Sequence, residues 1–164
     1  LLKPVTEEAV NRELTFIYRE RLPKRRIEIK TFGGFDLYVD GQLVRFGRAK
    51  SKELLAYLVD RRGLSVTTGE AYAALFEDAQ DTLSGKSYFR TILHEMVNSL
   101  KRADAEEILL KERNSYAVIP EKFDCDYYRF LQGDPMAVNA FQNDYMLSYS
   151  WAEIRNAELG SKEY

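Results

Sequence analysis

The most regular hydrophobic pattern in the chain lies between residues 84 and 103. Its apolar positions are three or four residues apart without a gap: Phe89, Ile92, Leu93, Met96, Val97 and Leu100. Such spacing places them on one side of an α-helix. The pattern therefore predicts a long amphipathic helix with a solvent-facing side. That side carries Arg90, Thr91, His94 and Asn98.

Two shorter helical patterns precede this helix. The first covers about residues 51–62 and stops at Gly63, the residue type that most readily adopts the left-handed conformation past a helix end. The second covers about residues 67–76. It begins at Thr67, with Glu70 three residues later, which is the spacing of a capping box. We therefore expect three helices in succession.

Apolar and polar residues alternate before these helices. Residues 27–29, 35–39 and 43–46 follow the period of two that half-buried strands have. Asp40-Gly41 separates the last two runs, and both residues tolerate the positive φ of a tight hairpin turn. This part of the chain predicts a small antiparallel sheet.

Further strand-like runs lie between and after the helices. A short run covers residues 65–67, and two more cover residues 108–111 and 116–119, joined by a polar turn at 112–115. The order is thus sheet, helix, strand, helix, long helix, hairpin. This order is that of an α+β winged helix-turn-helix, in which the long helix enters the major groove and the hairpin contacts the DNA backbone or minor groove.

Additional segments flank residues 27–120, which we take as the winged helix. A helix is expected near residues 6–20, because Val10, Leu14 and Ile17 form one apolar stripe. Residues 21–26 are rich in basic side chains, contain a proline and predict a linker. Residues 121–164 are aromatic-rich, with one helix ending near residues 133–135 and another near residues 151–159.

Composition removes several classes of protein from consideration. Cys125 and His94 are the only cysteine and histidine among 164 residues, so neither a disulfide within the chain nor a Cys/His zinc site can form. The sequence has no glycine-rich phosphate loop, no Ser/His/Asp arrangement and no apolar run long enough to span a membrane. We therefore expect a cytoplasmic protein that is not an enzyme, uses no cofactor or metal and does not contact a membrane.

Charge is distributed unevenly along the chain, although the net charge is only -2. Residues 19–62 contain 12 Lys and Arg against 6 Asp and Glu, whereas residues 120–164 contain 4 against 8. The first half can attract a polyanion such as double-stranded DNA. Charge alone is also compatible with an ordinary solvated basic surface.

The polar side of the long helix is the candidate site for reading DNA. It combines side chains that can grip phosphates with side chains that can hydrogen-bond to base edges. We expect base contacts from Arg90, Thr91 and His94, with Ser87 and Asn98 on the same side. The expected phosphate contacts are Arg48, Lys50, Lys52, Lys86 and Arg113. The alternative is a solvated helix face, which every amphipathic helix has.

Residues 27–119 resemble the OmpR/PhoB-type winged helix, in the variant of the Streptomyces antibiotic regulatory protein family. The resemblance rests on FDLYVDG at 35–41, KSKELLAYL at 50–58, SVTT at 65–68 and the long helix. The tail, with FDCDYYRF at 123–130 and YSWAE at 149–153, resembles the start of the helical bacterial transcriptional activation domain of that family. The resemblance implies a DNA-binding transcription regulator that forms homodimers and works with RNA polymerase.

The first residues, LLKPVT, resemble the end of a phosphoacceptor receiver domain. Residues 1–20 would then be the last strand end and last helix of that domain, and Lys3 its phosphoryl-contacting lysine, which has no phosphoryl group to meet in this fragment. This resemblance implies a response regulator of a two-component phosphorelay with a cognate histidine kinase.

One segment departs from the family pattern. Where these regulators carry a Ser-Arg-Leu-Arg-like run late in the recognition helix, this chain has His-Glu-Met-Val-Asn at 94–98. Glu95 would have the wrong charge for a site beside phosphates. The alternative function is therefore a winged-helix protein-interaction module with little or no DNA affinity.

Overall fold

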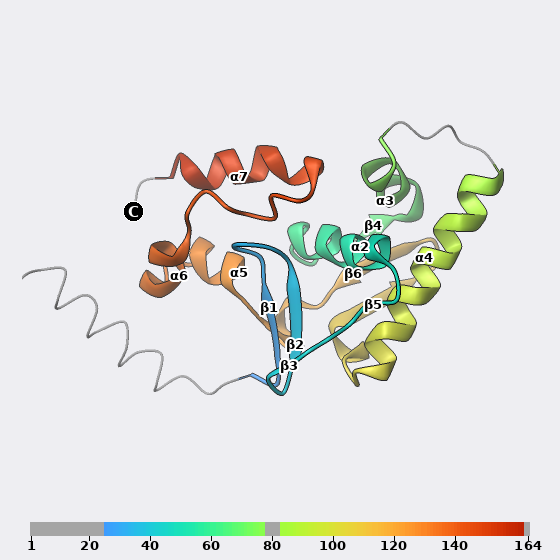
Figure 1. The fold of residues 1–164 in the computed structure, drawn as a ribbon, viewed down its shortest axis with the longest axis horizontal. Coiled ribbons are helices and arrows are strands. Elements are labelled where there is room, and N and C mark those ends of the chain that lie inside the picture. The colour runs from blue at the N-terminus through green and yellow to red at the C-terminus, as the bar shows by residue number, and fades with distance from the viewer. Residues whose placement is uncertain (1–24, 78–82, 163–164) are drawn as a thin grey trace, which may run out of the picture.

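The computed structural model describes residues 25–77 and 83–162. Its first sheet combines three strands near the start of this part with one strand that follows the wing (Figure 1). Its strand order is β3-β2-β1-β7. Three strands pair antiparallel, whereas β7 runs parallel to β1 and pairs Asp124 with Glu28. The strands are β1 (Ile27–Lys30), β2 (Asp36–Val39), β3 (Gln42–Leu43) and β7 (Asp124–Cys125).

The predicted hairpin at Asp40-Gly41 is confirmed. Val39 pairs with Gln42, and the two turn residues have φ of 49° and 79°, as a tight hairpin requires. The strand expected over residues 43–46 ends earlier, because after Leu43 only the Val44 amide still bonds to β2, at the Leu37 carbonyl.

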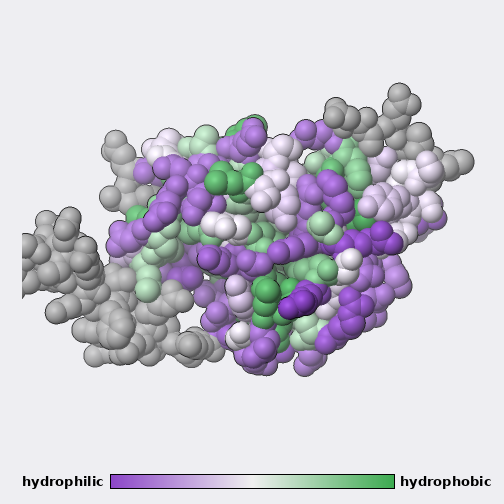
Figure 2. Space-filling view, viewed as in Figure 1, coloured by the Kyte–Doolittle hydropathy of each residue, from purple (hydrophilic) through white to green (hydrophobic). Residues whose placement is uncertain are grey.

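Three helices follow, as predicted: α2 (Ala49–Asp60), α3 (Thr68–Leu75) and α4 (Leu83–Arg102). The Thr67 side chain accepts a hydrogen bond from the Glu70 amide and caps α3. All six apolar positions of α4 are buried, whereas Arg90, Thr91 and His94 are exposed. Asn98 was expected to be exposed and is half-buried. Figure 2 shows mostly hydrophilic residues over the part of α4 that is visible at the right.

The second sheet forms the wing, with the order β4-β6-β5. Its turn is shorter than the predicted 112–115, because Glu112 and Ser115 still pair across the hairpin. Only Arg113 and Asn114 make the turn, and Asn114 adopts a φ of 60°, which asparagine tolerates better than most residues. The strands are β4 (Val66–Thr67), β5 (Leu109–Glu112) and β6 (Ser115–Val118).

After the wing, the chain returns to the first sheet and then forms short helices. The predicted helix near residues 151–159 is confirmed, whereas β7 and the helix that begins at Pro135 were not predicted. Asp134 caps this unpredicted helix by accepting from the Met136 amide. The remaining elements are η1 (Glu106–Ile108), η2 (Pro120–Lys122), α5 (Asp126–Leu131), α6 (Pro135–Ala140), η3 (Ser150–Ala152) and α7 (Glu153–Gly160).

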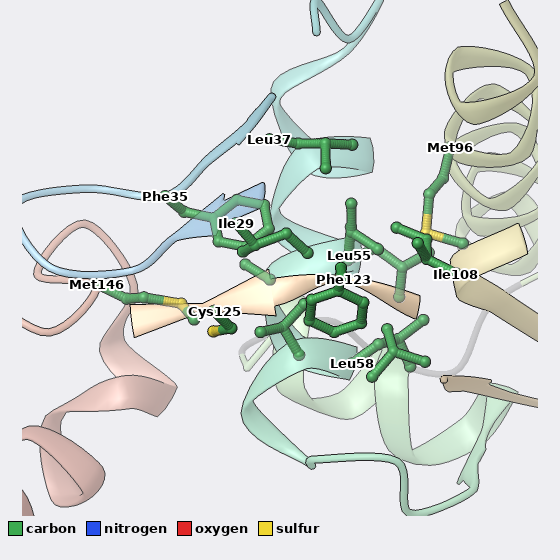
Figure 3. Packing of buried hydrophobic residues seen from close by; sticks show 14 of the residues in the cluster. Ile29, Phe35, Leu37, Leu55, Leu58, Met96, Ile108, Phe123, Cys125 and Met146 are labelled. Carbon is green, nitrogen blue, oxygen red and sulfur yellow. The ribbon is translucent and has the colours of Figure 1, made fainter. Parts of the chain in front are cut away.

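Helix α2 lies between the tail helices and α4 (Figure 1). Figure 3 shows Leu55 of α2 and Phe123 among side chains from both sides, with Met96 of α4 on one side and Cys125 on the other. Leu55 is 0% exposed and Phe123 2% exposed, within one continuous cluster of buried residues. Residues on both sides of the predicted boundary at 120 therefore share one core.

Buried polar contacts attach the tail to the rest of the fold. Asp126 accepts hydrogen bonds from the amides of Thr31, Phe32 and Tyr127, and also from the Thr31 hydroxyl. Burial raises the pKa of Asp126, and these four hydrogen bonds oppose the shift. At the C-terminal end of α2, Asp60 accepts from the Tyr145 hydroxyl at 2.6 Å.

Several sequence-based expectations fall on residues outside the described ranges. They are the helix near residues 6–20, most of the linker at 21–26, and Lys3. Within the described ranges, no helix combines the length and apolar character that a bilayer crossing needs.

Candidate nucleic-acid interface

The exposed side of α4 brings together most of the residues expected to read DNA. Ser87, Arg90, Thr91 and His94 are exposed, and Asn98 lies half-buried one turn further along. The Thr91 hydroxyl donates to the Ser87 carbonyl at 3.2 Å, so part of its hydrogen-bonding capacity is used within the helix. The side is hydrophilic, long and continuous, which suits insertion into a groove.

A buried hydrogen bond sets the position of α4 relative to α2. The Ser51 hydroxyl, which is 0% exposed, donates to the Ile92 carbonyl of α4 at 2.9 Å. Leu54, Leu55 and Leu58 of α2 are buried as well. The polar side of α4 is thus presented from a rigidly packed helix pair.

The wing tip carries Arg113, which is exposed. Its neighbour Asn114 accepts a hydrogen bond at its carbonyl from the Thr68 amide, at 3.1 Å, and β6 pairs with β4 just before α3. These contacts connect the tip of the hairpin to the first turn of α3. The position of Arg113 relative to the helices is therefore defined by backbone contacts.

Two of the expected phosphate contacts already have partners inside the fold. Lys50 donates to the Leu75 carbonyl at 2.8 Å and pairs with Glu53 at 2.9 Å. Lys52 pairs with Asp36 at 2.9 Å. Their role toward DNA stays a prediction, and it would require a phosphate to compete with these partners.

Arg48 differs from both lysines because its side chain is exposed at the start of α2. Its guanidinium carbon lies 5.9 Å from the ring centre of Tyr88, a cation–π contact with the first half of α4. The backbone amides at this end of α2 have no side-chain cap among the described residues, and no acidic residue occupies its first turn. Lys86, also near the start of α4, is exposed.

Glu95 does not have the arrangement that the sequence suggested. Its carboxylate pairs with Arg102 at 3.0 Å, and only 25% of its side chain is exposed. A Cβ added at Gly47 would lie 2.2 Å from Glu95 Oε1, so the carboxylate packs against the loop between β3 and α2. The negative charge is therefore compensated, and Gly47 provides the room for it.

Sequence reasoning missed a hollow beside this loop. It has a volume of about 350 Å³ and is lined by Leu43, Val44, Arg45, Phe46, Arg48, Ala49 and Lys52. Arg45 and Tyr88, both exposed, were absent from the expected site. The sequence contained no signal for Tyr88, because it meets Arg48 only through the packing of α4 beside α2.

Other chemistry is not apparent within the described residues. No group of three or more His, Cys, Asp or Glu side chains in residues 25–77 and 83–162 is placed to hold a metal ion. Cys125 is buried, and burial is the main cause that raises the pKa of its thiol, so it is not a reactive thiolate.

Comparison with known proteins supports the fold. No family model matches the chain, and no curated protein matches it. Among solved structures, the chain is similar to Mycobacterium tuberculosis EmbR in complex with a low-affinity phosphopeptide, with a TM-score of 0.65 and 18% identity. The likeness covers 84% of this chain and 42% of the EmbR chain, so this chain spans less than half of EmbR. It shows the shared α+β winged-helix fold.

Proposed function

We propose that this chain is the DNA-binding part of a transcription regulator and that α4 lies in the major groove of double-stranded DNA. The observation that carries the proposal is the exposed side of α4, where Arg90, Thr91 and His94 lie together on the helix that precedes the wing. Arg90 can make a bidentate contact with a guanine edge, and Arg113 can contact a phosphate from the wing tip.

The distribution of charge supports the same proposal. Glu95, whose negative charge was expected to oppose DNA binding, is paired with Arg102 and packs against the loop at Gly47. A phosphate approaching the polar side of α4 would therefore meet a compensated charge. The expected contacts to DNA are the exposed cations Arg48, Lys86, Arg90 and Arg113.

The resemblance noted above extends this proposal to a two-component system. In it, a receiver domain phosphorylated by a histidine kinase would control a homodimer of the regulator, and the tail would work with RNA polymerase in the cytoplasm. The residues that carry the receiver resemblance, including Lys3, lie outside the described ranges.

The second candidate function is a winged-helix protein-interaction module. It is favoured by the small number of Arg and Lys side chains on the polar side of α4, where Ser87, Thr91 and Asn98 accompany Arg90. Such a module would show little affinity for any duplex, at any salt concentration.

A titration of fluorescein-labelled duplex DNA, followed by fluorescence anisotropy over a salt series, separates the two functions. Phosphate contacts make the logarithm of the affinity fall linearly with the logarithm of the salt concentration, by about 0.9 for each phosphate. A slope corresponding to several phosphates supports the proposal. Absence of binding at about 50 mM salt, where even non-specific binders associate, would leave the interaction module.

A further inference from the structure

The hollow between β3 and α2 has the composition of a phosphate-binding site. Arg45, Arg48 and Lys52 surround it, and Val44 and Phe46 contribute to an apolar floor. Figure 2 shows an apolar, green area bordered by hydrophilic residues in the lower middle of the molecule, where β3 and the loop to α2 run in Figure 1.

The three cations are not equivalent. Lys52 is neutralised by Asp36 at 2.9 Å. The side chains of Arg45 and Arg48 are exposed, and neither pairs with an acidic side chain within residues 25–77 and 83–162. Arginine presents several donors in one plane, which matches the oxygens of a phosphodiester. The two arginines therefore provide the charge that the hollow can offer to an anion.

Tyr88 limits where the Arg48 guanidinium can lie. Tyr88 is 41% exposed, and its ring packs edge-on against Phe76, with ring centres 5.9 Å apart. The guanidinium carbon of Arg48 lies 5.9 Å from the centre of this anchored ring. A long, exposed side chain normally loses considerable rotamer entropy when it binds, and a preformed contact reduces that loss.

Arg48, which lines the hollow, connects it to α4 through its contact with Tyr88. Tyr88 and Thr91 are three residues apart, so their side chains are neighbours on the helix surface. A helix in the major groove has a sugar-phosphate strand along each flank, because the groove is only about 12 Å wide. The strand on the Tyr88 flank would pass the loop that carries Arg45 and Arg48.

We infer that this hollow binds a phosphodiester of the DNA backbone, with Arg45 and Arg48 as the contacting residues and Tyr88 as the residue that positions Arg48. The apolar floor accommodates the deoxyribose next to the phosphate. This inference rests on the proposed DNA binding; to the phosphate contact expected of Arg48 it adds the contact from Arg45 and the positioning of Arg48 by Tyr88.

The test measures duplex affinity against salt for the full chain and its variants. A labelled duplex of about 30 base pairs, three helical turns, serves as the probe. Loss of one phosphate contact in Arg48→Ala should make the salt slope shallower by about 0.9, so the affinity lost between about 50 and 200 mM salt shrinks by about 3.5-fold. Arg45→Ala should behave in the same way. Lys122→Ala is the matched control. Lys122 is exposed in η2, which packs near Gly63 past the other end of α2, so loss of its charge should leave the slope unchanged.

The role of Tyr88 is tested separately from that of Arg48. Tyr88→Leu should weaken binding by about 2- to 5-fold, the strength of an exposed cation–π contact, and leave the salt slope unchanged because Arg48 is still present. Tyr88→Phe keeps the ring and should bind with the affinity of the parent. Retained affinity would show that the ring, and not the hydroxyl, positions Arg48. In a double-mutant cycle, Tyr88→Leu should have no effect once Arg48 is alanine.

The outcomes distinguish the two proposals. If the parent chain binds no duplex, the proposed function fails and this inference fails with it. If the parent binds and Arg113→Ala makes its slope shallower, but Arg48→Ala and Arg45→Ala match Lys122→Ala, DNA binding stands and the phosphate site in the hollow is refuted. Equal loss of affinity in Tyr88→Phe and Tyr88→Leu would refute the positioning role alone. Circular dichroism melting confirms that each variant is folded.

Discussion

At the N-terminal end of α2, the Arg48 side chain is exposed, and among the described residues its one side-chain contact is the cation–π contact with Tyr88. At the C-terminal end, Asp60 is 6% exposed and bonded to two side chains of the tail. Asp60 accepts from the Tyr145 hydroxyl at 2.6 Å and pairs with Arg155 at 3.3 Å. The two ends of one helix thus place polar side chains toward solvent at one end and inside the fold at the other.

We expect the exposed end of α2 to serve DNA recognition and the buried end to serve the stability of the fold. The exposed end borders the candidate interface on α4, and its side chains can change partners without exposing the core. The buried end holds the tail, where Tyr128 also donates to the Val59 carbonyl at 2.6 Å. Substitutions at the buried end should therefore change the free energy of unfolding, and those at the exposed end should change DNA affinity.

The largest effect is expected at Asp126, on the tail side. Asp126→Ala leaves four buried donors without an acceptor and should lower the free energy of unfolding by about 3–5 kcal/mol. Urea denaturation measures this loss. Asp124→Ala is the control, because its pair with Arg129 is partly exposed and contributes about 0–1 kcal/mol. Similar losses in both variants would contradict the role of the buried carboxylate.

A second pair of substitutions compares two neighbouring tyrosines, whose ring centres are 4.9 Å apart. Tyr145→Phe removes the bond to Asp60 and should cost about 1.5–3 kcal/mol, as is usual for hydrogen bonds to charged groups. Tyr127→Phe should cost less than about 0.5 kcal/mol, because its buried hydroxyl has no hydrogen-bond partner among the described residues. Urea denaturation of both variants checks the contrast, and a larger loss for Tyr127→Phe would reverse it.

On the interface side, Arg90→Ala should weaken binding to a preferred sequence by about 1–3 kcal/mol and binding to other duplexes much less. The preferred sequence is first selected from a random duplex library. Because Arg90 is exposed, the free energy of unfolding should stay within about 0.5 kcal/mol of the parent. Equal loss on all sequences would make Arg90 a phosphate contact.

The smallest effect concerns Tyr127 of the tail, whose ionisation at alkaline pH should lower the free energy of unfolding. Burial raises the pKa of Tyr127 to about 12, above the ordinary value of about 10. A raised pKa in the folded state stabilises the fold below about pH 10, and this contribution is lost as the pH rises toward about 12. Between about pH 10 and pH 12, the free energy of unfolding of Tyr127→Phe should therefore fall by about 1–2 kcal/mol less than that of the parent. Urea midpoints at each pH measure the difference, and identical curves would contradict it.

Much of the winged helix could be predicted from local pattern. The spacing of the apolar residues in α4, the Thr67 cap and the turn at Asp40-Gly41 each depend on residues close in sequence, and all three are confirmed. Asn98 was misjudged because it lies at the edge of the polar side, where neighbouring packing decides exposure.

The tail was less accessible to sequence reasoning. Strand β7 has only two residues and exists because β1 offers its edge to Asp124 and Cys125. Helix α6 has six residues, too short for a periodic pattern to be distinctive. Asp126 looked like one more acidic residue of a solvated tail. The neighbouring sequence does not indicate that the amides of Thr31 and Phe32, about 95 residues away, donate hydrogen bonds to its carboxylate.

The amino-acid sequence by itself determined the order of elements and the amphipathic character of α4, because helical and strand periodicity are local properties of the chain. Only the tertiary structure decided which charges are available at the surface. Ion pairs occupy Lys50, Lys52 and Glu95, with partners 3, 16 and 7 residues away in the sequence. Arg48, at the start of α2, contacts Tyr88 of α4. Charge pairing depends on distances between side chains in space, and packing sets those distances after the local elements have formed.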